Sequence, residues 1–87
     1  MQHLHKKGDV VNVFQLSMRE GLLFEGRAKI VKPMGSPQDE HYMVQFLRKD
    51  GKPALGEKYE RFIDREGQDD PQAYIVAFNK RLGLKAA

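Results

Sequence analysis

The chain has 87 residues, of which 40% are hydrophobic and 31% are charged, and its formal net charge is +3. A chain of this length builds one domain with one modest core, and this composition is too apolar for an intrinsically disordered protein. Cysteine is absent, which excludes a disulfide framework and a thiolate zinc site, and no apolar run approaches the roughly 20 residues of a membrane-spanning helix. We therefore expect a cytoplasmic domain that folds in water and has no membrane partner.

The first half of the predicted sheet consists of two strands. Residues 10–16 are rich in β-branched and aromatic side chains, which favour a strand over a short helix. Over residues 24–31, small or apolar side chains alternate with mostly charged ones, which is the period of a strand with one buried face. The small residues Gly26 and Ala28 on the inward face suit a strand that bends sharply, as the strands of small barrels do.

The second half of the sheet is predicted after a polar segment. Residues 34–40 contain glycine, proline and polar side chains, which predicts a mobile loop. Residues 41–48 place Tyr42, Val44 and Phe46 on one face of a predicted strand, and they are followed by Asp50-Gly51, a dipeptide typical of hairpin turns. Residues 58–63 are predicted to form the fourth strand.

A C-terminal helix is the most regular element of the sequence, and it is predicted to begin at Pro71. Asp70 is expected to cap the helix, because its side chain accepts hydrogen bonds from the free N–H groups of the first turn. Apolar residues recur at helical spacing and predict a stripe that packs against the sheet. This stripe consists of Tyr74, Ala77, Phe78 and Leu82.

No motif of an enzyme or of a metal centre is found in the sequence. His3 and His5 supply only two ligands from a tail with little preorganisation. The carboxylates between residues 57 and 70 alternate with basic side chains, which favours exposed ion pairs, and neither serine lies in a nucleophile motif. We therefore expect no catalytic residue, no metal and no cofactor, and hence no enzymatic activity.

Charge is distributed unevenly along the chain. Residues 1–34 carry six basic and three acidic side chains, residues 53–70 carry three and six, and residues 71–87 carry three and none. Phosphate groups are attracted to basic surface and repelled by acidic surface, and Arg27 and Lys29 share the outward face of one predicted strand. Tyrosines among such cations are suited to stacking on bases. The residues predicted to contact nucleic acid or another partner are Arg27, Lys29, Tyr42, Arg48, Lys49 and Tyr59.

The phenylalanines are predicted to fill the core, because a domain of this size has few other large apolar side chains to bury. They are Phe14, Phe24, Phe46, Phe62 and Phe78. The tyrosines Tyr42 and Tyr59 are expected to be more open to solvent, since each hydroxyl needs water or a polar partner.

The order of these segments resembles that of small β-barrels of the SH3-like, Tudor or KOW type. The resemblance is carried by four stretches, at residues 8–13, 24–31, 42–46 and 60–63. It implies a mainly β fold with a small antiparallel barrel or curled sheet of about four to five strands, to which the C-terminal α-helix is an addition. The whole chain is predicted to be a single domain made of a flexible basic tail, the barrel, and an acidic linker with the helix. Their bounds are 1–7, 8–64 and 65–87.

Two functions remain open at this point, and both are non-enzymatic binding. Barrels of this kind include proteins that bind RNA or DNA, so one expectation is a nucleic-acid-binding module that uses a basic face of the barrel. The other is a protein-interaction or inhibitory accessory module, because exposed sheet edges can pair with another chain. In that case a second copy of the chain, forming a homodimer, is the first partner to consider.

Overall fold

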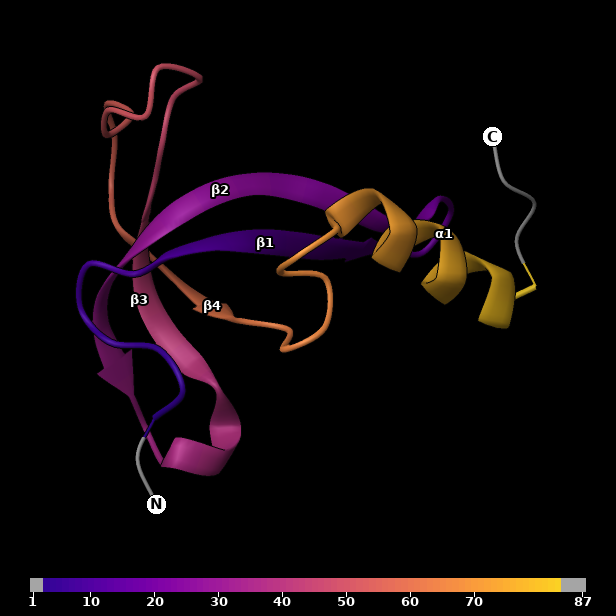
Figure 1. Ribbon diagram of the computed structural model, residues 1–87, viewed down its shortest axis with the longest axis horizontal. Coiled ribbons are helices and arrows are strands. Elements are labelled where there is room, and N and C mark those ends of the chain that lie inside the picture. The colour runs from indigo at the N-terminus through magenta and orange to yellow at the C-terminus, as the bar shows by residue number, and fades with distance from the viewer. Residues whose placement is uncertain (1–2, 84–87) are drawn as a thin grey trace.

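A computed structural model describes residues 3–83 as four antiparallel strands in one curled half-barrel sheet, followed by a helix (Figure 1). The predicted fold class is therefore confirmed. The strands lie across the sheet in sequence order: β1 (Val10–Ser17), β2 (Gly21–Met34), β3 (His41–Phe46) and β4 (Tyr59–Phe62). A 3-10 turn η1 (Pro37–Asp39) precedes β3, and helix α1 (Pro71–Arg81) follows β4.

Parts of two predicted segments lie outside the described residues, namely residues 1–2 of the tail and residues 84–87 after the helix. Within the part that is described, no helix is long and apolar enough to cross a membrane.

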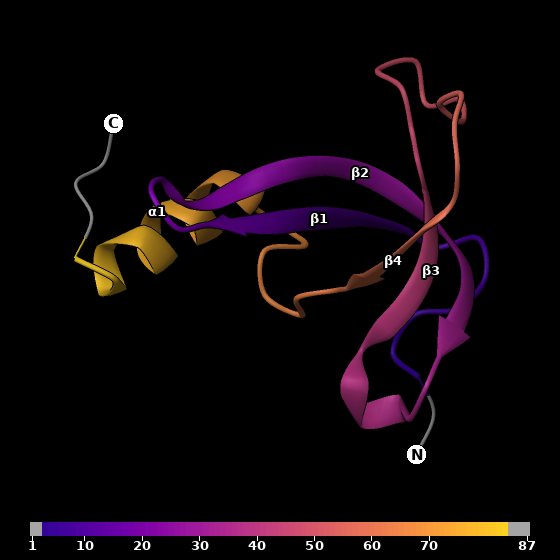
Figure 2. The same ribbon diagram turned by 180° about the vertical axis from the view of Figure 1, so that it is seen from behind.

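The longest strand, β2, gives the sheet its curl. It is longer than the alternating stretch at both ends, because its first residues pair with β1 and its last residues, 32–34, pair with β3. The β1–β2 register shifts between Val13 and Phe14, and the β2–β3 register shifts between Ile30 and Lys32. Such bulges increase strand twist, and β2 bends from a hairpin with β1 into a second pairing with β3 (Figures 1 and 2). We call the projecting end of that hairpin, residues 14–24, the arm.

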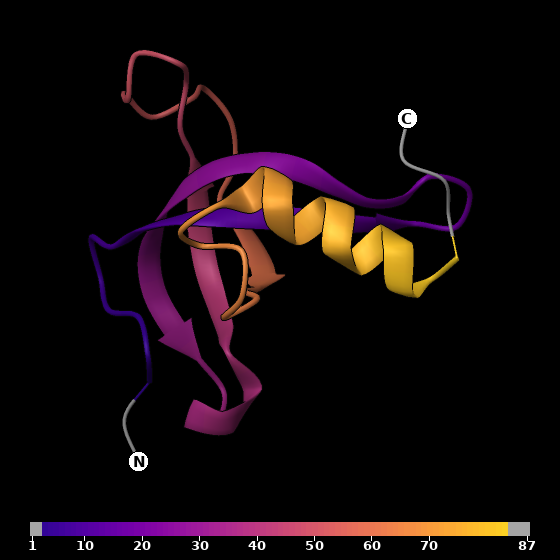
Figure 3. The same cartoon turned by 45° about the vertical axis from the view of Figure 1, so that its right-hand side comes forward.

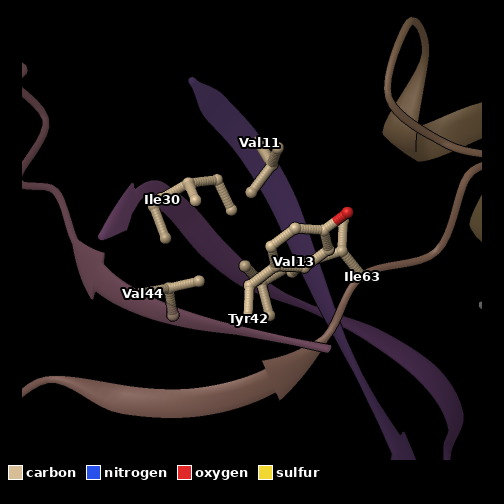
Figure 4. Close-up of a cluster of buried hydrophobic side chains, with 7 residues drawn as sticks. Val11, Val13, Ile30, Tyr42, Val44 and Ile63 are labelled. Atoms are coloured by element: carbon tan, nitrogen blue, oxygen red, sulfur yellow. The ribbon is translucent and has the colours of Figure 1, made fainter. Parts of the chain in front are cut away.

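The hydrophobic core lies on the concave face of the curled sheet, where alternate residues of neighbouring strands meet (Figure 4). It consists of Val11, Val13, Ala28, Ile30, Tyr42, Val44 and Ile63. The prediction of a phenylalanine core is wrong for Phe24 and Phe62, which are exposed, while the other three phenylalanines are half-buried at the periphery. In β4, Arg61 pairs with Tyr42, so Phe62 lies on the opposite face of the strand.

A polar network satisfies the hydroxyl of Tyr42, whose side chain is fully buried. This hydroxyl accepts a hydrogen bond from the backbone N–H of His5 (3.1 Å) and donates one to the Glu40 carboxylate (3.3 Å). Burial raises the pKa of Tyr42 above its ordinary value. The rings of His3 and His5 also lie edge-on to the Tyr42 ring, at centroid distances of 6.0 and 5.4 Å. Residues 3–5 thus pack on the domain, in contrast to the predicted free tail.

Two carboxamide side chains from the C-terminal part of the chain bind to open edges of the sheet. The side chain of Gln68 accepts from the Asn12 N–H (2.8 Å) and donates to the carbonyls of Asn12 (3.0 Å) and Asp64 (2.8 Å). The side chain of Asn79 accepts from the Leu22 N–H (2.8 Å) and donates to the Leu22 carbonyl (3.4 Å). Each carboxamide therefore supplies the pairing that a neighbouring strand would otherwise provide.

Helix α1 begins as predicted, with the Asp70 carboxylate accepting a hydrogen bond from the Ala73 N–H (3.1 Å). The helix lies along the arm (Figure 3), where the Tyr74 ring contacts Phe14 at a centroid distance of 5.1 Å and Phe78 lies beside Tyr74. The predicted stripe is correct for Tyr74 and Phe78 but wrong for Ala77 and Leu82, which are exposed. The polar contact made by Asn79 fixes which face of the helix meets the arm.

Candidate functional site

A row of three exposed cations follows the outer face of β2. Arg27 pairs with Asn12 of β1, Lys29 with Val10 of β1 and Gln45 of β3, and Lys32 with Met43 of β3. Directly paired residues point to the same face of a sheet, so the residues paired with these cations are uncharged, and Glu60 of β4, which pairs with Met43, shares this face. We call the three cations Arg27, Lys29 and Lys32 the basic stripe.

The basic stripe has free positive charge. None of its members forms an ion pair within residues 3–83. The basic residues that do form ion pairs there are His5, His41, Arg48, Arg61 and Arg65. The segment between β4 and α1 lies beside the start of the stripe, because the side chain of Asn12, the partner of Arg27, donates to the carbonyls of Gly67 (3.2 Å) and Gln68 (3.0 Å). The predicted shared face of Arg27 and Lys29 is confirmed by the register, and Lys32 joins them because the bulge after Ile30 returns the strand to the same face.

The remaining predicted cations lie away from this stripe. The backbone N–H of Leu47, and not that of Arg48, donates to the Arg27 carbonyl (2.9 Å), so Arg48 does not stand opposite Arg27. The Arg48 guanidinium instead donates to the Asp50 carboxylate in the turn after β3 (3.1 Å). Lys49 is exposed in the same turn. The structure therefore does not bring Arg48 into the row that the sequence suggested.

A second feature is an open hollow of about 400 Å³ on the concave side of the sheet, beside the core. It is lined by Glu25, Gly26, Phe46, Leu47, Tyr59 and Arg61. Tyr59 pairs with Val44 and Arg61 with Tyr42, which directs both side chains of β4 inward. Gly26 leaves space for the Phe46 ring, because a Cβ at this position would lie 3.3 Å from Phe46 Cδ1. We call this feature the hollow.

The chemistry of the hollow combines aromatic rings with a neutralised ion pair. Arg61 forms two hydrogen bonds of 2.9 Å each with the Glu25 carboxylate, and its side chain also donates to the Glu60 carbonyl. The guanidinium carbon lies 5.1 Å from the Tyr59 ring centre and 5.7 Å from that of Phe46. Hydrogen bonding to Glu25 raises the pKa of Arg61, so the guanidinium stays charged and fixed in place.

The two predicted tyrosines differ in what they offer a ligand. Tyr42 is 0% exposed, so its ring is not available at the surface, whereas Tyr59 is 42% exposed at the rim of the hollow. Sequence reasoning did not select Lys32 or Glu25 as parts of these surfaces. Lys32 follows the alternation only when the bulge is known, and the Glu25–Arg61 pair joins residues 36 positions apart. Neither relation leaves a signal in a single sequence.

A scan against protein-family models finds no match to this chain, and searches of curated proteins and of solved structures also find no similar protein. Among residues 3–83, no group of three or more His, Asp and Glu side chains is arranged to hold a metal ion. The surfaces that the fold offers are thus the basic stripe, the hollow, and the exposed parts of the arm and helix.

Proposed function

We propose that this domain is a non-enzymatic nucleic-acid-binding module whose basic stripe contacts the phosphate backbone. The observation that carries the proposal is the alignment of Arg27, Lys29 and Lys32 on one face, unpaired by acidic groups among the described residues. The half-barrel and its strand order support the resemblance to SH3-like small barrels, whose members include nucleic-acid binders.

The stripe favours backbone contact over base readout. Alternate residues of a strand stand roughly 7 Å apart, and each member of the stripe is an exposed, flexible cation. Such groups neutralise phosphates and release condensed counterions, which gives affinity that depends on salt and little on base sequence. We therefore expect micromolar or weaker binding at physiological salt, with little discrimination among sequences.

Titration of labelled oligonucleotides at several salt concentrations tests the proposal. The informative variant combines Arg27→Gln, Lys29→Gln and Lys32→Gln, and its matched control combines Arg19→Gln, Lys58→Gln and Lys80→Gln, which removes the same charge from other exposed positions. Loss of three phosphate contacts makes the negative slope of log affinity against log salt concentration less steep by about two to three. The proposal fails if wild-type protein does not bind at low salt, or if both triple variants lose affinity equally.

A second candidate function is protein interaction, because β1 is an unprotected edge strand. It lies at the end of the sheet, and its eight residues include neither a charged side chain nor a proline, the usual protections of an edge. Gln68 covers this edge at Asn12, while Leu16 and Met18 of the arm are exposed. We propose that, if the domain binds a protein, a second copy pairs antiparallel along β1 of the arm.

Sedimentation across a concentration series tests this candidate. Leu16→Lys adds a charge to the β1 edge, and Phe62→Lys makes the same change at a similarly exposed apolar residue of β4, the opposite edge strand. Pairing through β1 predicts a dimer that Leu16→Lys dissociates and Phe62→Lys preserves. A wild-type monomer at all concentrations would exclude self-association.

A further inference from the structure

We infer that the hollow receives one unpaired base of a single-stranded nucleic acid, which stacks on Tyr59 while phosphates contact the basic stripe. The inference rests on the proposed nucleic-acid function and names its substrate class. The placement of the two surfaces motivates it. Gly26 lines the hollow and Arg27 begins the stripe, so consecutive residues of β2 present the two surfaces on either side of one strand.

The sheet leaves a passage between these surfaces. The ladder between β2 and β3 ends where the Leu47 N–H donates to the Arg27 carbonyl, and the chain then leaves the sheet for the turn at residues 48–52. No described strand pairs with this side of β2 at Glu25 and Gly26. A strand of nucleic acid with its phosphate on Arg27 therefore reaches the hollow by turning one base around this open edge.

The chemistry of the hollow selects a neutral planar ring over a charged group. The Glu25 carboxylate already takes two hydrogen bonds from Arg61, so the guanidinium has no unbalanced charge with which to attract phosphate. An alkylated ammonium ion is also disfavoured, because Arg61 itself lies over the faces of Tyr59 and Phe46. What remains accessible is the part of the Tyr59 side chain that Arg61 does not cover, since this residue is 42% exposed, with fixed polar groups beside it. A nucleobase has the matching combination of an apolar face and a polar edge.

Duplex nucleic acid does not satisfy this arrangement. Its bases are paired and stacked within the helix, so a duplex contacts only the stripe, whereas a single strand contacts both surfaces. Stacking of one base on an aromatic side chain contributes roughly 5- to 150-fold in affinity. The structure therefore predicts tighter binding of a single strand at the same salt concentration once phosphate contacts are matched.

Tryptophan fluorescence tests the inference directly, because the chain contains no tryptophan. Tyr59→Trp places the single indole at the hollow, and Phe62→Trp places it on the opposite face of the same strand, at a residue that is 66% exposed. We expect a short oligothymidine to quench Tyr59→Trp more strongly than Phe62→Trp, which lies on the face of the basic stripe, and a duplex of equal length to quench Tyr59→Trp less than the single strand does. Tyr59→Ala should weaken binding of the single strand by roughly 5- to 150-fold without changing binding of the duplex. Tyr59→Phe should retain most of the affinity.

The outcomes separate this inference from the proposed function. If both oligonucleotides bind by anisotropy but Tyr59→Trp is not quenched, or if Tyr59→Ala weakens duplex binding equally, the hollow takes no base and the stripe alone binds. If no oligonucleotide binds at low salt, both the inference and the proposed function are overturned. Circular dichroism of each variant confirms that the fold is retained, which the exposure of Tyr59 leads us to expect.

Discussion

Gly67 connects β4 to α1 at a point where no side chain fits, and its replacement by alanine is the sharpest test of how the helix packs. Its φ of +90° lies in the left-handed region, which costs an alanine about 1–2 kcal/mol. A Cβ built on Gly67 would also lie 2.8 Å from Phe14 Cζ and 2.9 Å from Tyr74 Cγ. Forcing these rings apart in a packed site costs about 1–3 kcal/mol more.

Gly67→Ala is therefore expected to lower the free energy of unfolding by about 2–5 kcal/mol. The whole domain of 87 residues is stable by only about 4–13 kcal/mol, so this loss is a large fraction of the total. The corresponding decrease in Tm is roughly 8–40 °C. Urea unfolding followed by circular dichroism measures the free energy, and a thermal scan measures Tm.

Gly8→Ala is the matched control for this experiment. The φ of Gly8 is +95°, and nothing lies within 4 Å of a Cβ at that position, so this variant carries the backbone cost without the collision. The change in the entropy of the unfolded chain is the same for both variants and cancels in the comparison. Equal losses of stability in the two variants would refute the argument that Phe14 and Tyr74 close tightly over Gly67.

Two further predictions concern the contacts between the sheet and the C-terminal part of the chain. Gln68→Ala removes three hydrogen bonds and should lower the free energy of unfolding by about 1.5–4 kcal/mol in urea, whereas an unchanged midpoint would show that water replaces the carboxamide. Burial and the hydrogen bond to Asp64 raise the pKa of Tyr74 to about 12, from an ordinary value of 10.0, so the folded state holds this proton more tightly than the unfolded state. The resulting stabilisation is complete below pH 10 and is lost between pH 10 and about 12, and Tyr74→Phe should flatten that part of the stability curve; an unchanged slope would contradict the assignment.

The strands and the start of the helix were predictable because local patterns specify them. Alternation identified β2 and β3, and the Asp70-Pro71 pair identified the first turn of α1. The first residues of β2, Gly21–Leu23, lack alternation, and they are ordered by pairing with β1 instead.

The sides on which individual rings lie were less predictable, because pairing register and distant polar groups decide them. Tyr42 is buried because His5 and Glu40 satisfy its hydroxyl, and neither contact follows from periodicity. At the end of β4, apolar residues occupy both odd and even positions, so alternation does not show which side chains face the core. The pairing with β3 turns Ile63 inward and Phe62 outward. The rotation of α1 depends on Asn79, a polar residue to which hydrophobic spacing assigns no role.

In the candidate site, too, one feature follows from the local sequence pattern and another depends on contacts between distant residues. The shared face of Arg27 and Lys29 is a consequence of strand period and was predicted from the sequence alone. The hollow depends on a pair of charges from β2 and β4 and on the bulge beside Gly26, so it exists only once the strands are assembled.

The carboxamide contacts of Gln68 and Asn79 also determine the order in which the domain is completed. They join residues 56 and 57 positions apart, so we expect them to form after the local β1–β2 hairpin. Until residues 68 and 79 have been synthesised, backbone groups of Asn12 and Leu22 lack these partners, on strands whose neighbouring apolar surface is uncovered. A nascent or C-terminally shortened chain therefore presents an uncharged β1 edge with unpaired backbone groups to other chains. We therefore expect chains that end before residue 68 to aggregate more readily than the full chain.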